Sequence, residues 1–154
     1  MENEIKLAGI SNTDKILHIG CGSIPATSIY IVKKIDAEVT AIDKNFKSIK
    51  KAQKLIFKLK LFSKVHIVHA NALNFPLEKF NFIIVSLGLK SYNEVIRYIS
   101  QNMENDTRLI VRTSSSIDGN LVEKDLFLKD IFTIGKIIPQ EKNGLMISVL
   151  LFKK

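Results

Sequence analysis

The chain has 154 residues, of which 46% are hydrophobic, and a formal net charge of +8 at pH 7. This length predicts one globular domain, residues 1–154, and the longest apolar runs fall short of the roughly 20 residues that a membrane-spanning helix needs. The acidic N-terminus has no apolar leader segment, and the single cysteine excludes an internal disulfide. We therefore expect a cytoplasmic protein with no secretory signal and no membrane contact.

The first predicted elements are a short helix over residues 2–10 and an apolar strand over residues 15–19. A glycine-rich turn, Gly20-Cys21-Gly22-Ser23, follows this strand. Pro25 suits the first turn of a helix that extends to about Ile35, because a proline there loses no hydrogen bond. The order strand, turn and helix is the start of a nucleotide-binding βαβ unit.

The second strand, residues 39–42, ends at Asp43, which follows the glycines by about 20 residues, as in nucleotide-binding proteins. Glycines let the backbone approach a ligand, and a helix N-terminus offers free N–H groups. A carboxylate at this position can accept both ribose hydroxyls, so Asp43 is predicted to bind a ribose. The alternative is that Asp43 caps the next helix.

The rest of the chain continues to alternate helices and strands. A helix over residues 45–62 has apolar residues every three or four positions, among them Phe46 and Leu59. Further helices are predicted over residues 91–102 and 121–130, and strands over residues 64–69, 82–85, 107–111, 132–138 and 145–152. Asn143-Gly144 between the last two strands favours an antiparallel hairpin. We predict an α/β three-layer Rossmann-like sandwich, with a mostly parallel seven-stranded sheet and this antiparallel C-terminal hairpin.

The glycine-rich turn favours S-adenosylmethionine over NAD. The dinucleotide fingerprint has a third glycine where this chain has Pro25. A Gly-x-Gly turn with a carboxylate after the second strand resembles class I methyltransferases, which bind S-adenosylmethionine and end their sheet with an antiparallel strand. The alternative is a tight strand–helix turn in a protein that binds no nucleotide.

The resemblance to class I methyltransferases implies a set of cofactor-binding residues. The glycine-rich turn would hold the methionine part, Asp43 the ribose and Asn71 the adenine amino group, while the loop after the fourth strand would lie beside the methyl group. His18 stands where most of these enzymes have an acidic residue. The expected cofactor-binding residues are Gly20, Cys21, Gly22, Ser23, Pro25, Asp43, Lys44, Asn71, Ala72, Ser86 and Leu87.

A narrower resemblance is to nicotianamine synthases. Gly20–Ser28 resembles their Gly-x-Gly-Pro-Leu-Pro-Leu-Thr-Ser/Gly turn, Thr107–Thr113 their strand ending in Arg-Thr, and Ile147–Lys153 their last strand. The resemblance covers the Rossmann-like half alone, because only 14 residues precede the first strand, where that family has a helical domain. It implies transfer of the aminocarboxypropyl arm of S-adenosylmethionine, with release of methylthioadenosine.

Methyl transfer is the commoner reaction of this fold, so the first prediction is an S-adenosylmethionine-dependent methyltransferase that acts on a small molecule. The alternatives are an aminocarboxypropyl transferase, an RNA-modifying methyltransferase and a non-catalytic nucleotide-binding subunit. No catalytic residue is identified. Arg112, expected at the end of a strand, would bind a carboxylate or form a surface ion pair. Cys21 is predicted to fill space rather than to act as a nucleophile. His66 and His69 would point to opposite faces of a strand, which disfavours a metal site.

Lysines surround the helix predicted over residues 45–62, and no acidic residue lies between Asp43 and Glu78. They are Lys44, Lys47, Lys50, Lys51, Lys54, Lys58, Lys60 and Lys64. Such a face can attract nucleic-acid phosphates. Phe46 and Phe62 are assigned to the buried stripe, so aromatic partners are not expected among the lysines, and a solvated helix face is favoured. A nucleic acid, a second copy of the chain and a lid-supplying protein are the alternative partners.

Overall fold

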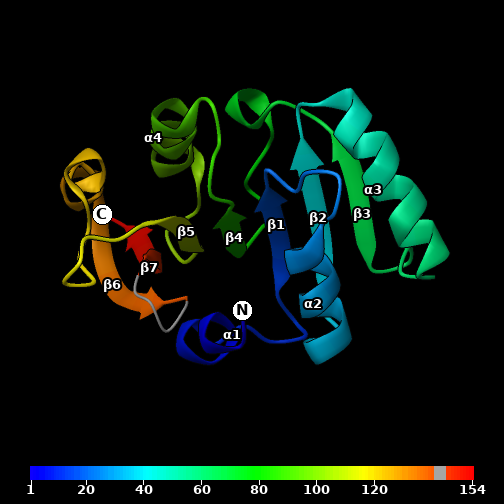
Figure 1. The fold of residues 1–154 in the computed structure, drawn as a ribbon, viewed down its shortest axis with the longest axis horizontal. Coiled ribbons are helices and arrows are strands. Elements are labelled where there is room, and N and C mark those ends of the chain that lie inside the picture. Colours follow the sequence, from blue (N-terminus) through cyan, green and yellow to red (C-terminus); the bar gives the residue numbers. More distant parts are fainter. Residues whose placement is uncertain (141–144) are drawn as a thin grey trace.

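The computed structural model describes residues 1–140 and 145–154, and it contains one seven-stranded sheet with the order β3-β2-β1-β4-β5-β7-β6 (Figure 1). The strands are β1 (Lys15–Ile19), β2 (Glu38–Asp43), β3 (Val65–His69), β4 (Phe82–Val85), β5 (Arg108–Ser114), β6 (Phe132–Pro139) and β7 (Met146–Lys153). The helices are α1 (Glu2–Ala8), α2 (Ala26–Ile35), α3 (Phe46–Lys58), α4 (Tyr92–Asn102) and α5 (Leu128–Ile131), with 3-10 turns η1 (Ala72–Asn74) and η2 (Glu123–Asp125). No helix in the described ranges has the length and apolar composition of a membrane span.

The predicted fold class is confirmed. β1 to β5 pair in parallel, and β7 is antiparallel to both β5 and β6. The predicted turn at Asn143-Gly144 lies outside the described residues. Helices cover both faces of the parallel strands, so β4 is buried along its whole length, as its Phe-Ile-Ile-Val sequence indicates.

Two apolar clusters pack on the two faces of the sheet. On one face α4 and α5 cover residues such as Leu17, Ile83 and Val111. On the other face α1 and α2 cover Ile16 and Ile84. Successive residues of a strand point to opposite faces, and each strand therefore contributes to both clusters.

Helix α3 is shorter than predicted and buries a narrower stripe. It ends at Lys58, and Lys60 then takes a left-handed conformation with φ of 57° that turns the chain toward β3. Its buried residues are Ile49, Ala52 and Ile56. Phe46 remains exposed, and so does Phe62 beyond the helix, so their assignment to the buried stripe was wrong. The physical reason is that β3 is the edge strand, and the outer flank of α3 has no further strand to pack on.

The segment between β5 and β6 also differs from the prediction. The helix predicted over residues 121–130 is replaced by a bridge between Ser115 and Leu121, the turn η2 and the short α5. The buried Asp125 carboxylate accepts a hydrogen bond of 2.6 Å from the Thr113 hydroxyl. Strand β5 reaches Ser114 because it pairs along its whole length with β7.

Two arginines of β5 hold the N-terminal segment against the sheet. Arg112 binds both carboxylate oxygens of the fully buried Glu4, each at 2.9 Å. Arg108 donates to Asp14 at 2.5 Å and to the carbonyls of Ala8 and Gly9. Arg112 is therefore inside a strand and paired, and the expectation that it would lie at a strand end and bind a ligand or form a surface pair was wrong.

We predict that Glu4→Gln destabilises the protein by about 3–5 kcal/mol near neutral pH, because it leaves the Arg112 guanidinium without a counter-charge. Burial opposes ionisation of Glu4, but the hydrogen bonds and charge of Arg112 outweigh it and hold the Glu4 pKa below its ordinary value. Its contribution is thus present above the ordinary carboxyl pKa and lost as the pH falls through the lowered value. Urea unfolding should show the parent and variant converging in acid.

The matched control is Glu2→Gln, which removes an exposed carboxylate of the same helix that contacts Lys6 and Lys34. It should change the free energy of unfolding by less than about 1 kcal/mol. Equal effects of the two substitutions would contradict the role given to the buried pair.

Candidate functional site

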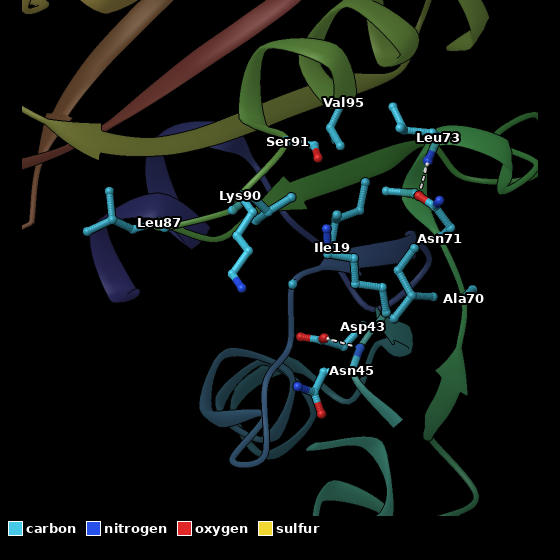
Figure 2. Close-up of a pocket in the computed structure, with 16 residues that line it drawn as sticks. Ile19, Asp43, Asn45, Ala70, Asn71, Leu73, Leu87, Lys90, Ser91 and Val95 are labelled. Atoms are coloured by element: carbon cyan, nitrogen blue, oxygen red, sulfur yellow. Dashed lines mark hydrogen bonds between the residues drawn. The ribbon is translucent and has the colours of Figure 1, made fainter. Parts of the chain in front are cut away.

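A cavity of about 500 Å³ opens at the carboxyl ends of the central parallel strands (Figure 2). The strand order reverses here. From β1 the chain builds β2 and β3 on one side, and then crosses to the other side of β1 to build β4 and β5. Open α/β sheets bind their ligands at such a switch point. Figure 2 shows Asp43 and Lys90 across this space from Asn71 and Leu73.

The backbone at the floor of the cavity favours glycine at position 20. Its φ of 78° lies in the left-handed region that other residues rarely adopt. A Cβ atom at this position would also lie 2.7 Å from Cδ1 of Leu89, so the end of that side chain would have to shift. The N–H groups of Gly20 and Cys21 both donate to the Ile42 carbonyl, at 2.9 and 3.1 Å, which fixes the turn against the end of β2.

Asp43 joins the glycine-rich turn to the start of α3. Its Oδ2 accepts from the Gly22 N–H at 2.9 Å, and its Oδ1 accepts from the Asn45 N–H at 2.8 Å. Each carboxylate oxygen has a second lone pair for a further donor. The cap of α3 is Asn45, whose side chain accepts from the Ser48 N–H, so the alternative assignment of Asp43 as that cap was wrong.

His18 lies beneath the glycine-rich turn, between the sheet and α2. Its Nδ1 is 2.8 Å from the Ser28 hydroxyl and its Nε2 is 2.8 Å from the Ser86 hydroxyl. Burial and the nearby Arg112 charge lower the His18 pKa to about 3, so the imidazole is neutral at neutral pH. One ring nitrogen then donates and the other accepts. His18 therefore provides a neutral hydrogen-bonded link between Ser28 of α2 and Ser86 after β4.

Asn71 begins the turn after β3. Its Oδ1 accepts from the Leu73 N–H at 3.0 Å, which shapes the wall formed by Ala72 and Leu73. Beside it, the ring Nε2 of His69 is 2.9 Å from the Lys44 carbonyl. These contacts hold the ends of β2 and β3 together along one side of the cavity.

The structure brings together six of the predicted cofactor-binding residues. The cavity is lined by Gly20, Asp43, Lys44, Asn71, Ala72 and Leu87. The other five lie next to this lining or behind it. Cys21 packs against Ala41 and Ile49, and Pro25 precedes the first residue of α2. Gly22 and Ser23 lie in the turn, and Ser86 bonds to His18 and precedes the lining residue Leu87.

The loop after the fourth strand, which includes Gly88 and Leu89, was expected beside the methyl group. Ten lining residues, these two included, were not among the expected cofactor-binding residues. They are Ile19, Ile42, Asn45, Ala70, Leu73, Gly88, Leu89, Lys90, Ser91 and Val95. Most of them follow β3 or β4 directly, and position after a parallel strand is the signal that would have found them. Val95 comes from the buried face of α4, which a sequence cannot assign to one cavity.

The Cys21 thiol is unsuited to nucleophilic attack. Burial, with a smaller effect of the Asp43 charge, raises its pKa to about 12, so the thiolate is scarce at neutral pH. His66 contacts Glu38 at 3.2 Å. Within the part of the chain that the structure describes, no three residues of the metal-binding types form a cluster.

Comparison with known proteins gives one family match and many solved structures. The family model described as tellurite resistance protein TehB matches residues 3–114. A point mutant of MtNAS, a nicotianamine synthase, in complex with S-adenosylmethionine is 22% identical, with a TM-score of 0.83 over 99% of this chain and 59% of that one. This chain thus spans about three fifths of the MtNAS structure. The search of curated proteins found no significant match.

Two methyltransferase structures are matched over a larger share of their length than MtNAS is. A SAM-dependent methyltransferase from Aquifex aeolicus is 17% identical, with a TM-score of 0.78 over 99% of this chain and 89% of that one. The magnesium protoporphyrin IX methyltransferase from Synechocystis with bound SAM is 15% identical, with a TM-score of 0.76 over 97% and 74%. At these identities the similarity shows a shared fold.

We predict that in His18→Gln the free energy of unfolding falls less steeply than in the parent as the pH is lowered. The folded His18 pKa is depressed, so its contribution is full above the unfolded pKa of about 6.5 and is lost as the pH falls toward about 3. In that window only the unfolded histidine takes up a proton, which costs the parent about 1.4 kcal/mol per pH unit. Glutamine can bond to both serines without titrating.

The measurement is the free energy of unfolding in urea between about pH 6 and about pH 4. The assignment of a buried neutral imidazole would be wrong if His18→Gln lost stability with acid as steeply as the parent.

Proposed function

This chain belongs to the TehB family of tellurite resistance proteins, and we propose that it is an S-adenosylmethionine-dependent methyltransferase that acts on a small-molecule acceptor. The family and the shared methyltransferase fold support a transferase. The observation that carries the proposal is the cavity at the switch point, with Asp43 placed between the glycine-rich turn and α3.

The residues of the cavity fit the chemical groups of S-adenosylmethionine. Its volume is within the range of about 300–1,000 Å³ that small-molecule sites have. Asp43 can accept from ribose hydroxyls through its remaining lone pairs. The apolar side chains of Ile42, Leu73 and Val95 offer a surface for a flat base. The positive φ at Gly20 allows the backbone to approach the methionine part.

The cofactor supplies an activated carbon on a sulfonium, so the protein mainly has to align an acceptor and exclude water. Leu87 and Leu89 from the loop after β4 line the cavity and give this side of it an apolar surface. Lys90 lies in the same loop, lines the cavity and offers a positive charge to an anionic acceptor. The family description makes tellurite the first oxyanion to assay as acceptor.

The second candidate reaction is aminocarboxypropyl transfer with release of methylthioadenosine. The observation that favours it is the neutral His18–Ser86 pair, which stands where most methyltransferases have an acid near the amino group of the cofactor. The likeness to MtNAS supports the same alternative. The two reactions leave different products, S-adenosylhomocysteine or methylthioadenosine, which chromatography separates.

We predict that the parent binds S-adenosylmethionine and S-adenosylhomocysteine in calorimetric titrations, and that Asp43→Asn weakens both by about 10- to 100-fold. The loss reflects hydrogen bonds to a charged acceptor, worth about 1.5–3 kcal/mol. Glu38→Gln, at the opposite end of β2, is the matched control and should bind as the parent does. Equal binding by Asp43→Asn and the parent would show that Asp43 does not hold the ribose.

A further inference from the structure

The outer flank of α3 exposes aromatic rings among lysines. Phe46, Phe57 and Phe62 expose 56%, 72% and 58% of their surface. Figure 1 shows α3 beside the edge strand β3, at the end of the sheet opposite to β6. We call the set Phe46, Lys50, Gln53, Lys54, Phe57, Lys58 and Phe62 the α3 edge surface.

The rings of the α3 edge surface are held in defined positions. Phe46 packs edge-to-face on His69 with centroids 5.5 Å apart, and the Lys50 ammonium lies 5.3 Å from the Phe46 ring centre. Phe57 stacks on Phe62 with centroids 5.8 Å apart. Positions 46 and 57 lie on one flank of the helix, about 16 Å apart at 1.5 Å per residue. The flank thus presents two aromatic groups along the helix axis, the Phe46 ring and the Phe57–Phe62 pair. We call these two groups the stations.

The charge around these stations is positive. The chain has no acidic residue between Asp43 and Glu78, and eight lysines lie in that stretch. Among the described residues, the only one of these lysines in a salt bridge is Lys64, which contacts Asp36 at 3.3 Å. The nearby Glu38 contacts His66. These two acids lie at the amino end of β2, on the side of Phe57 and Phe62, which share a pocket with His66. They lie away from Phe46 and the mouth of the cavity.

We propose that the α3 edge surface binds single-stranded RNA. Exposed ring faces can stack on unpaired bases, and lysines on the same flank can neutralise phosphates. A duplex hides its base faces, which disfavours double-stranded RNA. Gln53 lies between the two stations. Its side-chain nitrogen donates to the Ile67 carbonyl at 3.4 Å, and its side-chain oxygen can accept from the 2′-hydroxyl that distinguishes RNA from DNA. The line of stations begins at Phe46, two residues after the lining residue Lys44.

Two other occupants fit the surface less well. A second copy of the chain, paired about a two-fold axis, would bring two sets of lysines together. A membrane would need a continuous apolar face, but Ile49, Ala52 and Ile56 of α3 are buried against the sheet. The proposal concerns binding alone and does not depend on the proposed transferase activity.

The test is fluorescence anisotropy with a labelled, unstructured RNA of about 12 nucleotides, which exceeds the smallest sites of single-strand binding proteins. The parent should bind it, and Phe57→Ala should weaken binding about 5- to 100-fold, the range for loss of one stacked base. Lys54→Gln should reduce the slope of log affinity against log salt concentration by about one unit, because one phosphate contact is lost. Leu126→Ala and Lys124→Gln, on the segment before β6, are the matched controls and should bind as the parent does.

The same titration with DNA of the same sequence, with duplex RNA and with anionic vesicles tests the occupant. Weaker binding of all three supports the proposal. DNA bound as tightly as RNA, a preference for vesicles, or RNA binding unchanged in Phe57→Ala would overturn it. So would a stable dimer in sedimentation that Phe57→Ala dissociates, since the surface would then be an interface between copies.

Discussion

The Asp43 carboxylate fixes two walls of the cavity relative to each other. One oxygen accepts from Gly22 in the turn after β1, and the other accepts from Asn45 at the start of α3. Because the same turn also donates two N–H groups to the Ile42 carbonyl, the ends of β1 and β2 form one hydrogen-bonded unit. A ligand that uses the remaining lone pairs of Asp43 therefore meets a preorganised site, which lowers the entropic cost of binding.

A buried polar layer supports this unit from below. His18 connects Ser28 of α2 to Ser86 after β4, and Arg112 connects Thr27 of α2 to Glu4 of α1. These bonds join the N-terminus of α2 to β1, β4 and β5, the elements that surround the glycine-rich turn. In a low-dielectric interior each unmade bond of such a layer is costly, so the layer fixes the position of the turn as well as stabilising the fold.

The sequence predicted the strands well, because each buried parallel strand is a short apolar run that needs no knowledge of its neighbours. It also located Gly20 and Asp43, whose spacing along the chain reflects a local βαβ unit. It misjudged Phe46 and Phe62, because helical periodicity does not reveal that α3 lies at the edge of the sheet. It misplaced Arg112, because the length of β5 is set by pairing with β7, far along the chain. Val95 reaches the cavity only through the strand order.

The most direct test of the central claim is an NMR titration of isotope-labelled protein with S-adenosylhomocysteine. The account predicts that backbone amide shifts concentrate at the cavity, from Gly20 to Ser23, at Asp43 to Asn45, at Asn71 and at Leu87 to Leu89. The amides of Phe57 and Phe62 should remain unchanged. Shifts confined to other parts of the chain, or no shifts at saturating ligand, would contradict the assignment of this cavity as the S-adenosylmethionine site.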